Sequence, residues 1–423
     1  MERKYISDIK SGENVLLKGW VYELRDLAKL KFFLLRDSSG IIQCIVKDKK
    51  LMERFPELTL ESVVEVKGQV KKADIKAEFA RKDAEIEVSD FEIISVAEKL
   101  PIHINEKTTT TEFSTRLDYR FLDIRKPKVY AIFKIEATIM QAYREFMIKE
   151  GAMEAVFPSV ISASSEGGTE LFKLKYFEHN AFLSQSCQLY KQMLACSIEK
   201  VFTIFTVWRA EKHNTLRHLN ESRQLDFEMA FADEFDVMEI MGKCVQYIIK
   251  KVLEVNKEEL KVLEVDLKVP KMKSMTFEEV SELMKKNKIH VEKDDLTPEA
   301  EKKIGELYPD TIVFVHDWPL KGKPFYIMPK GNDLSRGFDA IYKGMELTSG
   351  GQRVHIPNIL IERLTAKGLN PKNFTAYIDS FRYGAPPHAG WGMGLERLTM
   401  LMLGLENIRE VVLFPRDRTR LTP

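Results

Sequence analysis

Five short runs rich in β-branched, aromatic and leucine residues follow one another near the start of the chain. They occupy residues 15–24, 32–37, 41–46, 63–70 and 85–95, and polar turns separate them. Runs of this length between turn residues predict β-strands. Five such strands within about 80 residues predict a small closed barrel.

The pattern changes after residue 97. The stretch 97–111 (AEKLPIHINEKTTTT) is polar and contains proline, which predicts a hinge. We therefore place a first domain at residues 1–97, a hinge at 98–115 and a second domain at 116–423. The OB-fold is the commonest nucleic-acid-binding barrel of five strands, and it is the fold we expect for the first domain.

The second domain opens with a helical pattern at residues 129–150, where apolar residues recur at helical spacing and Gly151 ends the run. Long strand-like runs follow at 200–211, 223–234 and 374–381, and the last precedes a glycine-rich turn and a helix. Strands dominate without regular alternation with helices, which predicts an antiparallel sheet in an α+β fold. Residues 254–315 are charged and helix-rich, and we interpret them as a peripheral insertion.

Composition narrows the class of protein. A chain of 423 residues is too long for one ordinary core, which agrees with two domains. No apolar tract can span a bilayer and no signal peptide is visible, so we expect a cytoplasmic protein without a membrane partner. A net charge of +1 excludes a protein that coats nucleic acid but not a large enzyme with local basic grooves. The four cysteines form no CxxC pair, which argues against a zinc site.

Three segments of the second domain suggest chemistry. Residues 156–158 (VFP) follow the long helix, a charged loop at 208–221 (WRAEKHNTLRHLNE) joins two apolar strands, and 392–397 (GMGLER) opens an apolar helix. Arginine and histidine at the density of that loop suit an anionic ligand such as phosphate, although a solvated hairpin tip is the alternative. The glycine pair alone is weak and fits an ordinary turn.

In this order the three segments resemble motifs 1, 2 and 3 of the class II aminoacyl-tRNA synthetases. Residues 165–172, 185–192, 344–353, 382–388 and 413–423 further resemble the aspartyl branch of subclass IIb. The resemblance implies an anticodon-binding OB barrel, a catalytic antiparallel sheet of six to seven strands flanked by helices, and a homodimer. It also implies that ATP activates L-aspartate, which is then transferred to the 3′ end of tRNA(Asp).

The resemblance assigns the ATP site residue by residue. Arg209 matches the group that holds the α-phosphate, and Glu211 lies beside the nucleotide and the substrate amine. The other ATP positions match Arg217, His218, Leu219, Glu346, Gly394, Glu396 and Arg397, and the implied Mg²⁺ ligands are Glu346 and Ser349. Attack of a carboxylate on the α-phosphorus builds negative charge, which a fixed guanidinium and a metal stabilise. Arg209, Glu211 and Arg397 are thus the expected catalytic residues.

The amino-acid site is assigned in the same way. Lys191 and Arg353 match positions that hold the side-chain carboxylate of aspartate, and the remaining positions match Glu166, Gln188, Arg209 and Ser349. Two cations facing one carboxylate reject asparagine, because its neutral amide leaves buried positive charge unpaired. Related asparaginyl enzymes have an apolar residue at the position of Lys191.

In the barrel, Arg25, Phe32 and Gln43 match anticodon-binding positions that stack on and hydrogen-bond a base. Without the resemblance, the sequence pattern favours a place for Phe32 in the hydrophobic core. Charging of tRNA(Asn) is left open, because the two anticodons differ only at the third base. We expect a preference for tRNA(Asp), read near Tyr22 and residues 71–83. Ser222 stands where many relatives have phenylalanine, which leaves open what stacks on the adenine.

Three alternatives remain. An asparaginyl-tRNA synthetase conflicts with Lys191, and a paralogue that amidates free aspartate conflicts with an intact OB domain. A non-catalytic nucleic-acid-binding protein with a degenerate synthetase body would have lost Arg209, Glu346 or Arg397, and all three are present.

Overall fold

The computed structural model describes residues 1–27, 30–105, 110–162, 171–212 and 215–423. They divide into two compact units, Met1–Tyr130 and Ala131–Thr422. In the described part of the chain, no helix is both long and apolar enough to cross a membrane.

The first unit contains a closed five-stranded barrel, as predicted. Its strands follow the order β1-β2-β3-β5-β4 around the barrel, with bounds β1 (Asn14–Leu27), β2 (Leu30–Arg36), β3 (Ile41–Val46), β4 (Val63–Lys72) and β5 (Ala84–Ser95). Alternate side chains of each strand fill the interior, as the period of two in a pleated strand requires. The short helices of this unit are η1 (Ile6–Asp8), α1 (Lys49–Arg54), η2 (Phe55–Glu57), α2 (Phe113–Asp118) and α3 (Arg120–Asp123).

A buried carboxylate joins the barrel to the segment after α3 within the first unit. Glu61 accepts a bidentate pair of hydrogen bonds from Arg36 at 2.9 and 2.7 Å. The Arg125 guanidinium donates to the same carboxylate at 2.9 Å. Two cations around one buried anion satisfy it fully, so this connection is specific in geometry.

The second unit is built on an eight-stranded sheet in the order β12-β13-β16-β17-β18-β11-β10-β6. The bounds are β6 (Met153–Glu154), β10 (Lys200–Trp208), β11 (Glu221–Ala230), β12 (Lys271–Thr276), β13 (Thr311–His316), β16 (Gly337–Tyr342), β17 (Met345–Gln352) and β18 (His388–Gly394). Neighbours from β13 to β10 pair antiparallel, and only the two edge pairs are parallel. The predicted antiparallel α+β sheet is confirmed, with two parallel edge strands added.

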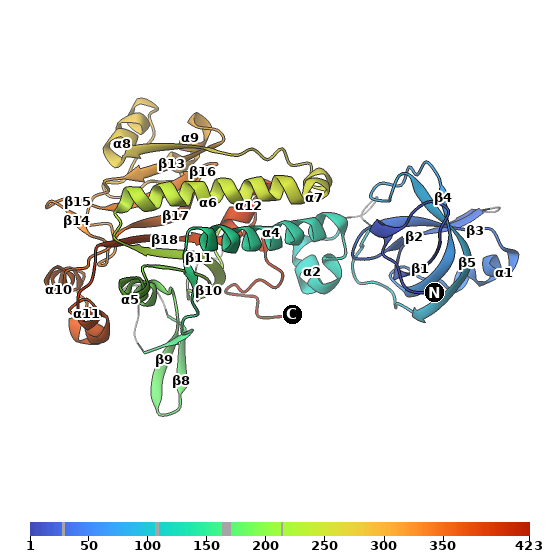
Figure 1. The fold of residues 1–423 in the computed structure, drawn as a ribbon, viewed down its shortest axis with the longest axis horizontal. Helices are drawn as coiled ribbons and strands as arrows, with labels where there is room; N and C mark the ends of the chain where they lie inside the picture. Colours follow the sequence, from blue (N-terminus) through green and yellow to red (C-terminus); the bar gives the residue numbers. More distant parts are fainter. Residues whose placement is uncertain (28–29, 106–109, 163–170, 213–214) are drawn as a thin grey trace. The chain divides into compact units, whose positions relative to one another are not determined.

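Helices α4 (Pro127–Lys149) and α6 (Glu234–Val255) cover one face of this sheet (Figure 1). Their apolar residues share one core with alternate residues of the strands, among them Leu225, Phe227 and Trp391. Helix α4 matches the predicted helix within two residues. Because Leu225 and Phe227 point into this core, the intervening positions of β11 face the opposite side of the sheet.

Two local predictions near the C-terminus were wrong. Residues 374–381, predicted as a strand, form the end of η3 (Pro371–Phe374) and the helix α11 (Thr375–Ser380). Phe374, Tyr377, Ile378 and Phe381 are buried in one cluster, and their spacing is helical rather than alternating. The glycine-rich segment at 392–394 is the end of strand β18, not a turn, and α12 (Leu395–Leu403) starts directly after it.

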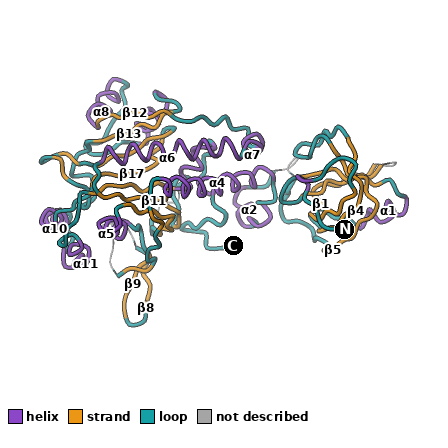
Figure 2. Tube along the Cα trace, in the orientation of Figure 1, coloured by secondary structure: helices purple, strands orange, loops and turns teal. Residues whose placement is uncertain are grey.

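The segment 254–315 is not only peripheral, because it supplies the sheet edge strand β12 and most of β13. It also contains the helices α7 (Lys257–Val262), α8 (Phe277–Lys286) and α9 (Pro298–Leu307). The other small elements are β7 (Val160–Ile161), β8 (Lys173–Tyr176), β9 (His179–Leu183), α5 (Gln188–Ile198), β14 (Pro329–Lys330), β15 (Leu334–Ser335), α10 (Pro357–Ala366) and η4 (Ile408–Val411). Figure 2 shows the β8–β9 hairpin projecting away from the central sheet.

The packing of α6 generates a stability prediction. Val245 is 0% exposed and Val255, on the same helix, is 60% exposed. Val245→Ala should lower the free energy of unfolding by about 2 kcal/mol, through lost burial and a residual cavity. The identical change Val255→Ala should cost less than about 0.5 kcal/mol. Urea unfolding followed by circular dichroism measures both, and equal midpoints for the two variants would contradict the core assigned to α6.

Candidate active site

A row of polar positions crosses the sheet on the face opposite α4 and α6. Strand pairing places Asp339 beside Ser349, Ser349 beside Gly392, and Gly392 beside Asp226. Directly paired residues of neighbouring strands point to the same side. Residues far apart in the sequence therefore meet on one surface, two of them carboxylates.

A bulge in β17 brings Glu346 to this same surface. Residues 346 and 349 are three apart, so a regular strand would point them to opposite faces. The pairing shifts between Ala340 and Ile341, which leaves Leu347 as an extra residue on β17. Such a bulge resets the alternation. The Glu346 carboxylate and the Ser349 hydroxyl consequently lie on one face, and both are accessible.

Glycines form the floor between the acidic strand β11 and strand β17. A Cβ atom at Gly390 would lie 2.3 Å from Glu228 Oε2, and one at Gly392 would lie 3.1 Å from Asp226 Oδ1. The absence of side chains at these two positions leaves room for the carboxylates of β11. At Gly390 glycine is therefore required by the close approach of Glu228 and of the Phe227 carbonyl rather than by a turn, whereas Gly392 is only tightly surrounded.

The predicted aspartate-binding cations are buried and meet two carboxylates that sequence reasoning missed. Lys191 Nζ on α5 donates to Asp226 Oδ1 and to the Trp391 carbonyl, both at 2.6 Å, and lies 3.5 Å from Glu228 Oε2. Arg353 donates to both oxygens of Glu228 through Nε and Nη2 at 2.8 and 3.2 Å. The structure thus brings Lys191 and Arg353 together around a shared acidic pair.

The two cations favour the ionised form of Glu228. Burial by itself would raise the pKa of Glu228, but Arg353 and Lys191 outweigh burial and hold that pKa below its usual value. Asp226 and Glu228 could have been found in the sequence, because they alternate with Leu225, Phe227 and Met229 in the apolar second half of β11. Period-two polar positions inside a buried strand indicate a polar site rather than a solvated face.

Arg353 has donors left over. A guanidinium carries five N–H groups in a planar fork, and Glu228 takes up only Nε and Nη2. Among the residues that the structure describes, Nη1 makes no hydrogen bond to a protein acceptor. Gln188 begins α5 one turn before Lys191, and its side chain donates to Gln192 at 2.9 Å. Glu166, the remaining residue predicted for this site, lies outside the described residues.

The charged loop between β10 and β11 is fixed at its base. Asn220 donates to the carbonyls of Arg209 and Glu211 at 2.7 and 3.0 Å, and the Arg209 N–H donates back to the Asn220 carbonyl. Arg209 and Glu211 are both half-buried at the end of β10. The base of the loop is therefore a closed turn that sets the positions of these two residues.

The three ATP-site residues predicted on the far side of the loop, Arg217, His218 and Leu219, differ in burial. His218 shares a hydrogen bond with Thr215 at 2.6 Å and is exposed, whereas Leu219 packs into the main core. Arg217 is half-buried, with its backbone N–H bound to Thr215. Arginine side chains of the C-terminal segment also donate to this loop, from Arg409 to the Thr215 carbonyl and from Arg418 to the Lys212 carbonyl. Leu219 contributes to the core, so a contact with ATP would have to come from its backbone.

A second acidic region surrounds Glu346. Arg397 on α12 donates to the Glu346 carbonyl oxygen at 2.7 Å, and its Nη1 lies 3.8 Å from the carboxylate. Glu301 on α9 accepts from the Glu346 N–H at 3.4 Å. Burial, and then the nearby Glu346 charge, raise the pKa of Glu301 to about 7. Burial raises the pKa of Asp339 to about 6, and Lys323 opposes that rise.

Glu396 and Gly394 have structural contacts. Gly394 is the N-cap of α12. The Glu396 carboxylate is buried and accepts from the Arg223 N–H at 3.0 and 3.1 Å. It thereby joins the first turn of α12 to β11, and its oxygens are engaged there rather than turned toward the open face.

The oxygen donors fit Mg²⁺. Glu346 and Ser349 present a carboxylate and a hydroxyl on one face, and Mg²⁺ prefers few protein oxygens completed by water and phosphates. No group of three or more His, Cys, Asp or Glu side chains suited to a metal occurs among residues the structure describes. This donor set suits a metal bound jointly with a phosphate ligand better than a closed structural site.

The predicted anticodon residues share one outer face of the barrel. Arg25 pairs with Phe32 across β1 and β2, with its guanidinium 5.5 Å from the ring centre. Gln43 on the adjacent β3 donates to Glu85 at 2.7 Å. Tyr22, by contrast, is buried, so its ring offers no free edge to a base.

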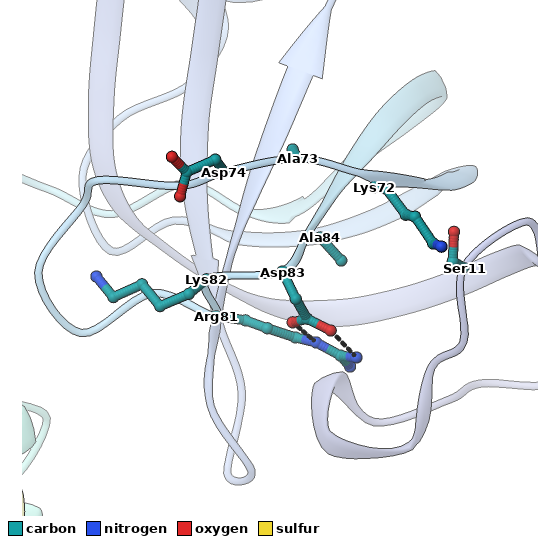
Figure 3. A pocket seen from close by; sticks show the side chains of 8 residues that line it. All are labelled: Ser11, Lys72, Ala73, Asp74, Arg81, Lys82, Asp83 and Ala84. Atoms are coloured by element: carbon teal, nitrogen blue, oxygen red, sulfur yellow. Dashed lines mark hydrogen bonds and ion pairs between the residues drawn. The ribbon is translucent and has the colours of Figure 1, made fainter.

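A shallow cleft lies beside the loop that joins β4 and β5. Figure 3 shows Lys82 beside the Arg81–Asp83 ion pair, and the cleft is lined by Ser11, Lys72, Ala73, Asp74, Arg81, Lys82, Asp83 and Ala84. Arg81 is occupied by Asp83 and by the carbonyls of Ile6 and Ile9. Lys72 and Lys82 are the exposed cations of this cleft, where they suit phosphate rather than base edges.

Comparison with known proteins places this geometry in a family. Residues 112–418 match the model for tRNA synthetases class II (D, K and N), and residues 15–94 match that for OB-fold nucleic acid binding domains. The chain is 44% identical to an aspartate–tRNA(Asp/Asn) ligase of Archaeoglobus fulgidus, with 100% of both chains covered. It is 43% identical to an aspartate–tRNA(Asp) ligase of Pyrococcus horikoshii, covering 99% of this chain and 98% of the other.

Solved structures agree with these relatives. The asparaginyl-tRNA synthetase of Pyrococcus horikoshii, complexed with asparaginyl-adenylate, superimposes with a TM-score of 0.93 at 35% identity over 100% of both chains. The barrel, the antiparallel sheet and the order of the three motifs are thus explained together. The chain belongs to the class II tRNA synthetases of the D, K and N type.

Proposed function

We propose that this chain is an aspartate–tRNA ligase, which uses ATP to form aspartyl-adenylate and transfers the aspartyl group to tRNA(Asp). The observation that carries the proposal is that Lys191 and Arg353 are buried together around the β11 carboxylates, on the sheet face opposite α4 and α6. Full-length relatives named as aspartate–tRNA ligases, at 41–46% identity, support the same choice.

Aspartate binds, in this proposal, with its side-chain carboxylate on the unused edge of Arg353. One guanidinium can hold two carboxylates on separate edges, and Glu228 occupies the first. Lys191 contributes its third N–H, which has only long contacts of 3.5 Å, with the Phe227 carbonyl and with Glu228 Oε2. Gln188 and Ser349 border the same space, and Glu166 belongs to the set that the family resemblance assigns.

ATP lies across the base of the charged loop and the start of α12. Arg209 holds the α-phosphate, Glu211 adjoins the nucleotide and the substrate amine, and Arg397 holds the distal phosphate end. Arg217, His218, Leu219, Gly394 and Glu396 complete the assigned contacts, the last with its side chain committed to Arg223. Bound Mg²⁺ would be held by Glu346 and Ser349 and would neutralise phosphate charge.

Adenylate formation needs no general base, because the attacking α-carboxylate of aspartate is already ionised and pyrophosphate leaves the α-phosphorus as the new P–O bond forms. Negative charge grows on the α-phosphoryl oxygens, and a guanidinium fixed before the reaction stabilises it without reorganising. The closed turn at Asn220 fixes the backbone from which the Arg209 guanidinium extends. The 3′-terminal hydroxyl of tRNA then attacks the carbonyl of the mixed anhydride, its proton passes to the departing phosphate, and AMP is released.

For tRNA, we propose that the outer face formed by Arg25, Phe32 and Gln43 binds the anticodon. An aromatic ring between a cation and an amide suits a stacked base with a hydrogen-bonded edge. tRNA(Asn) is proposed as a second, poorer acceptor, because Tyr22 is buried and lysines on the β4–β5 loop hold phosphates without reading sequence. This chain would act in the cytoplasm.

A test of the amino-acid assignment uses ATP–pyrophosphate exchange with each of the twenty amino acids. Aspartate alone should support rapid exchange. Lys191→Leu should lower it at least about a hundredfold, because the buried Asp226 then lacks its cation and the substrate carboxylate loses a donor, while ATP binding persists. Lys243→Leu, an exposed position on α6, is the control. Comparable exchange with asparagine would refute the assignment and favour an asparaginyl enzyme.

The phosphate assignment predicts slower adenylate formation in Arg209→Ala and in Glu346→Ala. Each should lose roughly 10²-fold or more in the exchange rate, the usual effect of losing one preorganised charge-stabilising group. Aspartate binding should change less. Arg3→Ala and Glu239→Ala, two exposed residues elsewhere, are the matched controls. Near-normal rates in either site variant would mean that the motif assignment is misplaced.

We further propose a homodimer of about twice 49.0 kDa. Support comes from exposed apolar side chains beside the edge strand β6: Met153, Val160 and Val156, which is 96% exposed. Val156→Asp should weaken association roughly a hundredfold, because a twofold interface contains the changed residue twice. Val255→Asp is the exposed control, and sedimentation equilibrium is the measurement. An unchanged dimer would show that the interface lies elsewhere.

A further inference from the structure

Four polar side chains form a buried chain of hydrogen bonds behind the proposed aspartate site. Gln188 and Gln192 lie one turn apart on α5, Tyr377 lies on α11, and His388 begins β18. All four are buried. Buried donors and acceptors must find matching partners, so the orientation of each group can be worked out by counting them.

The imidazole of His388 starts the chain. Its Nδ1 lies 3.0 Å from the Pro386 carbonyl oxygen, which can only accept, so Nδ1 carries a proton. Burial lowers the pKa of His388, which keeps the ring neutral with a single proton. Its Nε2 is therefore an acceptor.

Gln192 has one compatible orientation. The atom 3.0 Å from His388 Nε2 must be the amide nitrogen, because an oxygen there would oppose an unprotonated nitrogen. The amide oxygen then faces Tyr377 Oη and Gln188 Nε2, each at 2.9 Å, and accepts from both. A flipped Gln192 would place like groups together at His388 and at Gln188.

Gln188 is fixed in turn. The NH₂ group of Gln188 donates to Gln192, so the Gln188 carbonyl oxygen points the other way. This oxygen accepts no hydrogen bond from any residue in the described part of the chain. Gln188 and Lys191 are three apart and so share a face of α5. This face presents both an acceptor and a cation to the substrate.

We propose that Gln192, oriented by the proton on His388 Nδ1, is a positioning residue that holds the Gln188 carbonyl oxygen toward the α-ammonium of aspartate. The inference rests on the proposed function. An inverted Gln188 would turn N–H donors toward the positive ammonium, which is unfavourable. In this proposal Gln192 does not contact the substrate, and it determines which end of the Gln188 amide faces the substrate.

Comparing aspartate with succinate, which is aspartate without its amino group, distinguishes this role from a general disruption of the binding site. In Gln192→Met the KM for aspartate should rise about tenfold, the effect of one hydrogen bond to a charged group, with a smaller change in kcat. The inhibition constant of succinate in ATP–pyrophosphate exchange should stay within about twofold. Equal losses for both compounds, or no loss for aspartate, would overturn the proposal.

A further variant separates the effect of the orientation of Gln192 from the effect of the number of hydrogen bonds it makes. Tyr377→Phe removes a donor to the same Gln192 oxygen but leaves its orientation to His388, so the KM for aspartate should change less than about threefold. A rise as large as in Gln192→Met would overturn the proposal. Gln141→Met, on the exposed face of α4, is the matched control. Absence of aspartate-dependent exchange in the unmodified enzyme would instead refute the proposed function.

A measurement on the unmodified chain tests the first step even if Gln192→Met does not fold. Labelling the 8 histidines with ¹⁵N lets nuclear magnetic resonance report which ring nitrogen is protonated. The His388 resonance is identified as the one that shifts in Tyr377→Phe. We expect a protonated Nδ1 and an unprotonated Nε2, and a protonated Nε2 would overturn the proposal.

Discussion

The pairing of Lys191 and Arg353 with Asp226 and Glu228 is the constraint around which the active face of the sheet is arranged. A single unpaired charge at this depth would cost several kcal/mol, so all four groups have to be positioned together. They come from three elements, α5, β11 and β17 with its continuation, which the pairs hold in register. Gly390 lacks a side chain because a Cβ atom would collide with Glu228.

In the proposed function, this arrangement also explains how two cations that already hold protein carboxylates can select a substrate with a charged side chain. Each cation keeps a protein carboxylate and still has donors to offer, so the cations remain compensated when the substrate is absent. A neutral amide in place of the substrate carboxylate would face the unused donors of Arg353 and Lys191 with its own N–H groups. Selection then follows from donor and acceptor matching as much as from net charge.

The proposed nucleotide side of the site depends on backbone geometry more than on charge pairs. The bulge at Leu347 places Glu346 and Ser349 together, and the hydrogen bonds of Asn220 close the loop that carries Arg209. The acidic neighbours Glu301 and Asp339 have raised pKa values, which reflects carboxylates crowded into a partly buried space. Such crowding is relieved when a cation binds.

The sequence by itself determined what depends on local periodicity. Alternation specified the five barrel strands and β10 and β11, helical spacing specified α4, and the order of the motifs indicated the family and the candidate residues. The strand that we predicted at 374–381 was wrong although the local pattern was already helical, because Phe374, Tyr377, Ile378 and Phe381 recur at helical spacing. The sequence did not reveal the strands β12 and β13, because they lie in the charged segment 254–315 that we interpreted as a peripheral insertion. Only tertiary structure decided the partners of Lys191 and Arg353, because Asp226 and Glu228 reach them through strand pairing across the sheet. Side-chain period is a property of a few consecutive residues, whereas hydrogen-bond and charge partners are chosen among residues that the fold brings together from 35 to 200 positions apart.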